Sequence, residues 1–228
     1  MTDRDDSPLD DPVGESLRGH HAHLARRFGR AATYVPEVAT LSAISAAPDP
    51  RGWADLAQLL GRGQLADLFS CTAQPPADWE PVFALPARQM VGPTSGTAPD
   101  AGAVELGDAD VPDMLALAER TRPGPFWART RELGTYLGVR QNGALVAMAG
   151  ERLRPPGWTE ISAVCTAPEA HGRGHATRLI TSLIARITAR GERPFLHVTE
   201  TNTGALALYE HLGFTTRKHV TIRGYRTP

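Results

Sequence analysis

The spacing of apolar residues is most regular in the second half of the chain. Across residues 176–187, apolar side chains recur at steps of three and four, a period that predicts a helix of about three turns with one buried face. Gly191 is a natural C-terminal stop for this helix, and the apolar run at residues 194–198 predicts the strand that follows it.

Shorter runs around that helix complete a predicted sheet. Asn142-Gly143, the pair best suited to a type I′ turn, lies between strand-like runs at residues 136–140 and 144–152 and predicts a hairpin. Residues 159–166 predict a third strand. The remaining predicted elements of this half are a helix that begins at Asp110, a short helix over 126–133, a helix over 205–212 and a closing strand over 220–225. This order of helices and strands predicts a mixed α/β sheet.

The first half of the chain gives weaker signals. The one-faced apolar spacing of residues 53–60 predicts a helix that Gly61 ends, and residues 64–71 predict a short strand. Further strands are expected between Trp79 and Met90, where several prolines weaken the pattern. This half has no chemical signature.

Two changes in composition divide the chain. Residues 1–12 are rich in aspartate and poor in apolar surface, which predicts a disordered tail. Residues 92–102 are rich in glycine, proline and small polar residues, which predicts a domain boundary. We therefore expect a tail over 1–12, an N-terminal domain over 13–95, a linker over 96–102 and a C-terminal domain over 103–228.

The charge balance argues against nucleic acid and membranes as partners. The chain has 24 lysine and arginine residues against 25 aspartate and glutamate residues, a formal net charge of -1. It therefore has no global basic field to attract nucleic acid or anionic lipid. No apolar run has the length of a signal peptide or a bilayer span, so a cytoplasmic protein is expected.

A metal site is not expected. Cys71 and Cys165 lie far apart and belong to no CxxC pair. His20, His21 and His23 form a cluster without spaced carboxylate or thiolate support, so a solvated helix face is the better interpretation.

A glycine-rich loop at residues 171–177 carries the clearest chemical signal. Its glycines let backbone N–H groups approach a ligand, and the first turn of the following helix stabilises an anion. Phosphate is therefore the expected ligand. Arg173 adds a positive charge suited to a pyrophosphate, although a lone GxG is more often an ordinary turn. A Walker loop is not supported, because His175-Ala176 follows Gly174. A dinucleotide fold fails because Thr177 stands in place of the third glycine.

This loop resembles the acyl-CoA loop of the GNAT superfamily of N-acetyltransferases, whose signature is Gln or Arg, two residues, Gly, one residue, and Gly or Ala. Gly174 and Ala176 match the signature, and His171 departs from its first position. Residues 202–214 are similar to a second family motif, N-x-x-A-x-x-L-Y-x-x-x-G-F. Because two ordered motifs are more specific than one, residues 103–228 are expected to adopt the GNAT fold.

The chain also looks like the glycine-N-acyltransferase-like branch of that superfamily, whose members often carry a degenerate copy of the fold in their N-terminal half. By that resemblance, residues 13–91 form a copy without a CoA loop. A family-specific cap packed on the catalytic half fits the same residues equally well.

The resemblance implies a set of acetyl-CoA contacts. The main chain of residues 164–166 pairs with the pantetheine arm, and a backbone N–H there polarises the thioester carbonyl. The amides of residues 172–177 take the pyrophosphate. The expected CoA-binding residues are Val164, Cys165, Thr166, His171, Gly172, Arg173, Gly174, His175, Ala176, Thr177, Asn202 and Tyr209.

Catalytic roles follow from the same resemblance. Tyr209 matches the tyrosine that protonates the CoA sulfur, with core packing as the alternative. Asn202 matches a pantetheine-binding position and is also a candidate helix N-cap. Glu160 is the first candidate for the base that deprotonates the amine, with an exposed strand glutamate as the alternative. His197 and His211 rank below it, and Cys165 is expected to be a packing residue.

The implied function is an acyl-CoA-dependent N-acyltransferase that moves acetyl to the primary amine of a small molecule or amino acid by direct attack. A non-catalytic acyl-CoA sensor or docking module is one alternative, to which the departure at His171 points. A protein acetyltransferase acting on lysine or an N-terminus is another. The resemblance implies acetyl-CoA as co-substrate and no metal, and both a monomer and a homodimer stay open.

Overall fold

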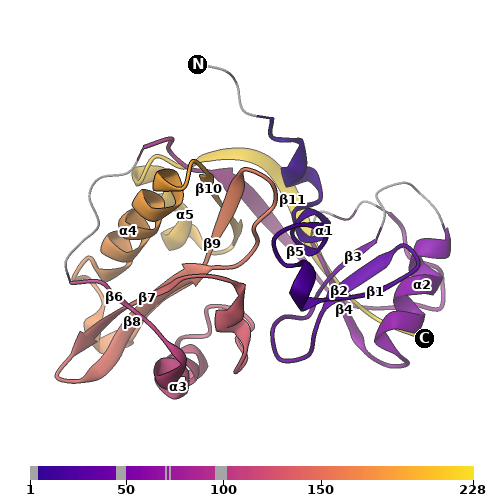
Figure 1. Cartoon of the computed structure of the whole chain (residues 1–228), viewed down its shortest axis with the longest axis horizontal. Coiled ribbons are helices and arrows are strands. Elements are labelled where there is room, and N and C mark those ends of the chain that lie inside the picture. The colour runs from indigo at the N-terminus through magenta and orange to yellow at the C-terminus, as the bar shows by residue number, and fades with distance from the viewer. Residues whose placement is uncertain (1–4, 45–49, 70, 72, 96–101) are drawn as a thin grey trace.

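The computed structural model describes residues 5–44, 50–69, 71, 73–95 and 102–228. Within them, one mixed sheet has the strand order β1-β2-β3-β4-β11-β5-β10-β9-β8-β7-β6 (Figure 1). The strands are β1 (Ala25–Phe28), β2 (Ala31–Tyr34), β3 (Leu41–Ile44), β4 (Leu65–Leu68), β5 (Glu80–Val91), β6 (Val104–Glu105), β7 (Tyr136–Gln141), β8 (Ala144–Glu151), β9 (Trp158–Thr166), β10 (Arg193–Thr199) and β11 (Thr215–Arg226). The α-helices are α1 (Pro12–Arg18), α2 (Pro50–Leu60), α3 (Val111–Thr121), α4 (His175–Ala189) and α5 (Thr203–His211).

The C-terminal half confirms the elements with the strongest patterns. The buried residues of α4 keep the predicted spacing and join the core beneath β8 and β9. Asn142 and Gly143 both have positive φ angles, 50° and 83°, as a type I′ turn requires. The short helix expected over 126–133 is only the 3₁₀ turn η4 (Thr130–Leu133). No described helix is long and apolar enough to cross a membrane.

Part of the order of elements in the N-terminal half recurs in the C-terminal half. Strands β1, β2 and β3 pair antiparallel, and α2 connects β3 to the parallel strand β4. In the C-terminal half, β7, β8 and β9 pair antiparallel, and α4 connects β9 to the parallel strand β10. Each half is therefore an antiparallel meander followed by one parallel crossover.

The two halves exchange their closing strands. β5, from the N-terminal half, lies between β10 and β11, while β11 pairs with β4 as well as with β5. Figure 1 shows these two long strands running from one lobe to the other. The closing strand thus pairs within the chain, and the halves predicted at 13–95 and 103–228 share one sheet. Most of the linker predicted at 96–102 lies outside the described residues.

The segment predicted as a disordered tail is ordered over residues 5–12, so that prediction is wrong for these residues. They form the 3₁₀ helix η1 (Ser7–Asp10) and the start of α1, and the side chain of Leu9 is completely buried. Asp6 and Asp10 form ion pairs with Arg217 of β11 at 2.7 and 3.1 Å. One apolar anchor and complementary charges on β11 therefore hold a segment whose composition alone predicts disorder.

Candidate active site

A gap opens in the middle of the sheet between β9 and β10. The two strands pair only where Trp158, Thr159 and Glu160 face residues 193–195. Beyond that point, β9 continues against β8, and β10 continues against β5. The main chain of residues 161–166 therefore borders the gap without a neighbouring strand on that side. Ala163 has a φ of 53° at a register shift, so a bulge reorients the main chain here.

A cleft of about 1150 Å³ follows this gap. It brings together all the residues expected to hold CoA: Val164, Cys165, Thr166, His171, Gly172, Arg173, Gly174, His175, Ala176, Thr177, Asn202 and Tyr209. Its other end is lined by N-terminal residues, which the sequence analysis did not connect with the site.

The glycine loop forms the start of α4 as predicted. Gly172 and Gly174 have φ angles of 73° and 74°, and no side chain caps the helix at Gly174. Backbone donors at this helix start are thus available for an anion. The loop is braced from β7, because Arg173 donates to Gln141 Oε1 at 3.1 Å, and Gln141 Nε2 lies 3.1 Å from His175 Nε2. Sequence reasoning missed Gln141, which is far from the loop in the chain.

The departure from the CoA signature at His171 has a structural explanation. Its Nε2 lies 2.8 Å from the carbonyl oxygen of Thr166, at the end of β9. The side chain therefore closes the turn between the strand and the glycine loop. A ring N–H that donates to this carbonyl holds the loop in place from within.

The opposite wall of the cleft carries the second predicted motif. Asn202 caps α5, with Oδ1 accepting a hydrogen bond from the N–H of Ala205 at 3.2 Å. Tyr209 of α5 lines the cleft, is 8% exposed, and has its ring centroid 5.8 Å from that of Phe214. Burial raises the pKa of Tyr209 to about 12, so the phenol keeps its proton at neutral pH, as a proton donor requires.

Glu160 is not placed as either sequence interpretation expected. Its side chain is completely buried and does not border the cleft. Both carboxylate oxygens bind Arg152, at 2.7 and 2.8 Å, and one also accepts from His197 Nδ1 at 2.7 Å. Burial alone would raise its pKa, but the Arg152 charge and these hydrogen bonds lower it to about 2. Such a carboxylate is a weak base with no access to an amine.

The two histidines ranked below Glu160 differ in position. His197 lines the cleft, with Nδ1 on Glu160 and Nε2 3.2 Å from Gln89 Nε2. The Gln89 amide donates to the carbonyl of Leu9, so its nitrogen faces His197 as a donor and His197 Nε2 accepts. His197 is thereby held as the Nδ1–H tautomer. His211 is exposed and does not line the cleft.

The remaining sulfur and histidine candidates have structural surroundings. Burial raises the pKa of the Cys165 thiol, which fits a packing residue and not a nucleophile. His21 is buried, so the solvated face predicted for its cluster is wrong at this position. Its Nδ1 accepts from the Tyr34 hydroxyl at 2.8 Å, and its Nε2 donates to the Leu133 carbonyl at 3.0 Å. Across the described residues, no group of three potential ligands is placed to hold a metal.

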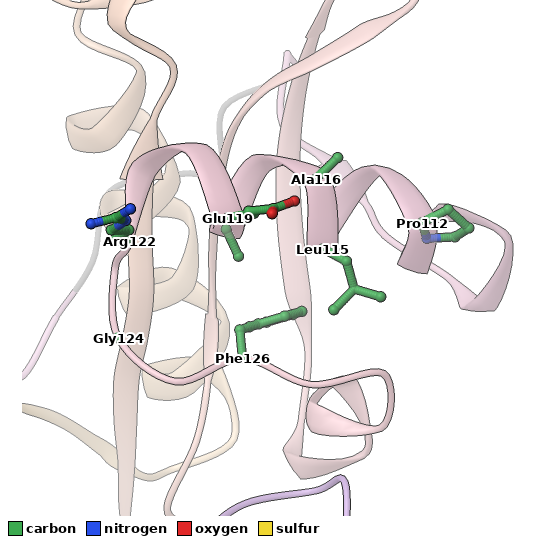
Figure 2. A pocket seen from close by; sticks show the side chains of 8 residues that line it. Pro112, Leu115, Ala116, Glu119, Arg122, Gly124 and Phe126 are labelled. Carbon is green, nitrogen blue, oxygen red and sulfur yellow. The ribbon is translucent and has the colours of Figure 1, made fainter.

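A second, shallower cavity of about 630 Å³ lies along α3. Figure 2 shows Leu115 of α3 pointing toward the segment that carries Phe126. Arg122 and Gly124 line both this cavity and the main cleft, so the turn after α3 separates the two spaces. The main cleft alone contains the predicted motifs.

Known proteins are similar to this chain in sequence and in fold. Residues 136–223 match the family model described as FR47-like protein. The N-alpha-acetyltransferase RimI of Mycobacterium tuberculosis is 39% identical over 99 residues, which cover 40% of this chain and only 61% of that protein. A GNAT-family crystal structure from Novosphingobium aromaticivorans is 40% identical, with a TM-score of 0.89 over 98% of this chain and 100% of that one. A GCN5-related N-acetyltransferase from Kribbella flavida, 16% identical, shares the fold with a TM-score of 0.65 over 96% of each chain. The chain therefore belongs to the GNAT family.

Proposed function

We propose that the protein transfers the acetyl group of acetyl-CoA to the primary amine of a small molecule or amino acid, by direct attack in a ternary complex. The observation that carries this proposal is the gap between β9 and β10, which leads into the cleft formed by the glycine loop and α5. A strand edge, a helix start and a protonated phenol then line one space.

The cofactor contacts follow from the groups that line the cleft. The amides of residues 172–177 at the start of α4 take the pyrophosphate, and Arg173 adds a positive charge. The unpaired edge of β9 at residues 164–166 binds the pantetheine arm through main-chain hydrogen bonds. Asn202 lines the same cleft, which supports a role for it beside this arm.

The reaction needs one bond made and one bond broken. The amine nitrogen attacks the thioester carbonyl carbon, and a β9 backbone N–H stabilises the oxyanion that develops. The carbon–sulfur bond then breaks, and Tyr209 gives its proton to the departing thiolate. The proton lost by the nitrogen passes to solvent in the cleft and balances the proton that Tyr209 recovers. The products are the N-acetylated amine and CoA.

Glu160 has a positioning role in this scheme. It holds the Arg152 guanidinium and the His197 ring, both of which line the cleft, through short hydrogen bonds. With its pKa near 2, it stays ionised at neutral pH and orients these groups without exchanging a proton.

We further propose that residues 13–91 descend from a second copy of the fold, as in glycine-N-acyltransferase-like proteins. The shared order of meander, crossover helix and parallel strand supports this proposal. The exchange of β5 and β11 is what two copies would produce if each gave its last strand to the other.

A protein N-terminus is the second candidate acceptor. The observation in its favour is the similarity to the N-alpha-acetyltransferase RimI, which is confined to 40% of this chain. A peptide with a free N-terminus therefore belongs in every acceptor panel.

Thiol release from acetyl-CoA with a panel of amines, amino acids and peptides tests the proposal. Tyr209→Phe should lower kcat by at least about 100-fold and leave acetyl-CoA affinity within about twofold, because the phenol acts only as the thiolate leaves. Tyr225→Phe is the matched control, since Tyr225 packs against Trp53, outside the cleft. An unchanged kcat in Tyr209→Phe would refute the acid assignment. Binding of acetyl-CoA without turnover of any amine would favour the sensor alternative.

A further inference from the structure

The cleft extends beyond the residues expected to hold CoA, here called the CoA-associated residues, into the N-terminal half. The part of its lining contributed by strands and loops before residue 92 is Val38, Ala39, Thr40, Leu41, Asp67, Phe69, Phe83 and Leu85. Most of these side chains are apolar, and one of them, Asp67, is acidic. A carboxylate in such surroundings requires an explanation.

Asp67 lies on β4 with one carboxylate oxygen unsatisfied. The residue is 6% exposed, and its Oδ2 accepts a hydrogen bond from the Thr40 hydroxyl at 3.2 Å. Its Oδ1 is buried and has no hydrogen-bond partner among the described residues. A buried oxygen without a partner costs free energy, and a ligand donor would recover that cost.

The register of β4 aims this carboxylate away from the part of the core that lies under α2. Ala66 and Leu68 belong to the apolar core under α2, and side chains alternate along a strand. Asp67 and Phe69 therefore face the other side, where both line the cleft. An aspartate that served only to hold the sheet would use both oxygens within the protein.

No described cation neutralises Asp67. Arg152 is near enough to lower its pKa, but the guanidinium is bound by both oxygens of Glu160 and lies 4.9 Å from the Phe69 ring centroid. The His197 ring makes its contacts with Glu160 through Nδ1 and with Gln89 through Nε2, and none with Asp67. Burial raises the pKa of Asp67, as expected for a carboxylate without an ion-pair partner. This end of the cleft thus carries one acidic group that forms no ion pair among the described residues.

We propose that Asp67 binds the ammonium group of the acceptor, that this group gives up one proton to solvent in the cleft before its nitrogen attacks acetyl-CoA, and that the acceptor is a primary amine with an apolar body. This inference rests on the proposed acetyl transfer and adds the class of its substrate. The apolar body would pack against apolar side chains that line the same cleft: Phe69, Phe83, Leu85, Trp127 and Ile222. The N-terminal half then supplies the charged contact and part of the apolar lining for the acceptor, while the C-terminal half supplies the CoA site and the rest of that lining.

Calorimetric titration of the full chain, saturated with desulfo-CoA, tests the inference without turnover. The probes are 2-phenylethylamine and leucinamide, which are protonated near neutral pH, and 2-phenylethanol, a neutral molecule of similar shape. Asp67→Asn should weaken binding of both amines at least tenfold and leave the alcohol unchanged, because only the charged contact is lost. In the acetylation assay, the same variant should raise KM for the amine more than it lowers kcat.

Two further variants complete the test: a control outside the cleft and a second change next to Asp67. Asp55→Asn removes an aspartate of α2 whose Oδ2 accepts from the N–H of Arg30, outside the cleft, and should change no affinity. Thr40→Val removes the hydroxyl that orients Asp67 and should weaken amine binding by a smaller factor than Asp67→Asn. This variant still tests the inference if Asp67→Asn does not fold.

The outcomes separate this inference from the proposed function. If wild-type protein binds desulfo-CoA but neither amine, or if Asp67→Asn binds the amines as tightly as wild type, the inference is overturned and the CoA site stands. If desulfo-CoA itself does not bind, the proposed acetyl transfer fails instead. Equal weakening for the amines and the alcohol would show that Asp67 only shapes the cleft, and would also overturn the inference.

Discussion

At the scale of single residues, Glu160 shows how a fold keeps a buried charge. Burial penalises an isolated carboxylate, yet this one is ionised because Arg152 offers two hydrogen bonds and a positive charge. His197 adds a third hydrogen bond from the cleft side. The arrangement ties the end of β8 to β9 and β10, at the point where the last two strands separate.

Replacing Glu160 by Gln should therefore lower the stability of the protein without removing a catalytic base. The variant leaves the Arg152 guanidinium without its counterion, which should cost about 3 kcal/mol in the free energy of unfolding measured with urea. Glu200→Gln, at an exposed pair with His219, should cost less than about 1 kcal/mol. Wild-type stability combined with loss of the acidic limb of the pH–rate profile would contradict this account and restore Glu160 as the base.

At the scale of elements, α4 and the loop before it form the proposed anion site. Gly172 and Gly174 place the backbone in the left-handed region where the loop turns into the helix. An added Cβ would meet nothing within 4 Å at either position, so the requirement for glycine comes from the backbone conformation and not from crowding.

Substitutions at the two ends of α4 separate binding from stability. Gly174→Ala and Gly191→Ala both place alanine at a φ of 74° in open space, and each should cost about 1 kcal/mol of stability by thermal unfolding. Only Gly174 lines the cleft, so only its variant should weaken acetyl-CoA binding, by several-fold in a titration. Equal CoA affinity in the two variants would show that this loop does not hold the pyrophosphate.

The elements also differ in how well the sequence predicted them. The long amphipathic α4 and the Asn142-Gly143 hairpin were predicted because their signals are local and span many residues. Strands β1, β2 and β3 were missed because, unlike the equally short β4, they lie in no run of strand-like residues and consist largely of alanine, arginine and serine. The helix expected over 126–133 is reduced to one 3₁₀ turn.

The residues of the candidate site also differ in how well the sequence predicted them. The CoA-associated residues lie in two continuous motifs and were found together. Thr40, Asp67 and Phe69 come to the cleft only through the packing of the two halves, so no local pattern marks them. The burial of Glu160 was also unpredictable, because it depends on Arg152 and His197 from neighbouring strands.

At the scale of the whole molecule, contacts outside the shared sheet also join the two halves. A core cluster combines Leu9, Val13 and Leu17 with Trp158 and Phe195 of the C-terminal half. His21 adds a polar link, since it donates to the Leu133 carbonyl in the turn before β7. The N-terminal residues that line the cleft are thereby held at a defined place relative to the C-terminal residues proposed to bind CoA.

His21 should make this junction sensitive to acid. Burial lowers its pKa from 6.5 to about 4, so the folded protein keeps it neutral while the unfolded chain binds a proton below about pH 6.5. Its contribution is complete above pH 6.5 and is lost as the pH falls toward 4, by up to about 3 kcal/mol. The fall in unfolding free energy between pH 7 and pH 4 should therefore be smaller in His21→Gln than in wild type. The exposed His23→Gln control should match wild type, and an equal fall in all three would contradict the assignment.

The central claim is that the cleft between β9 and β10 binds acetyl-CoA. Calorimetric titration of the full chain with acetyl-CoA tests it most directly, with desulfo-CoA and ATP as companion ligands. The account predicts saturable binding of both CoA compounds and none of ATP, because the cleft combines a pyrophosphate site with a strand edge suited to the pantetheine arm. Absence of binding by both CoA compounds would contradict it and leave a GNAT fold without its cofactor site.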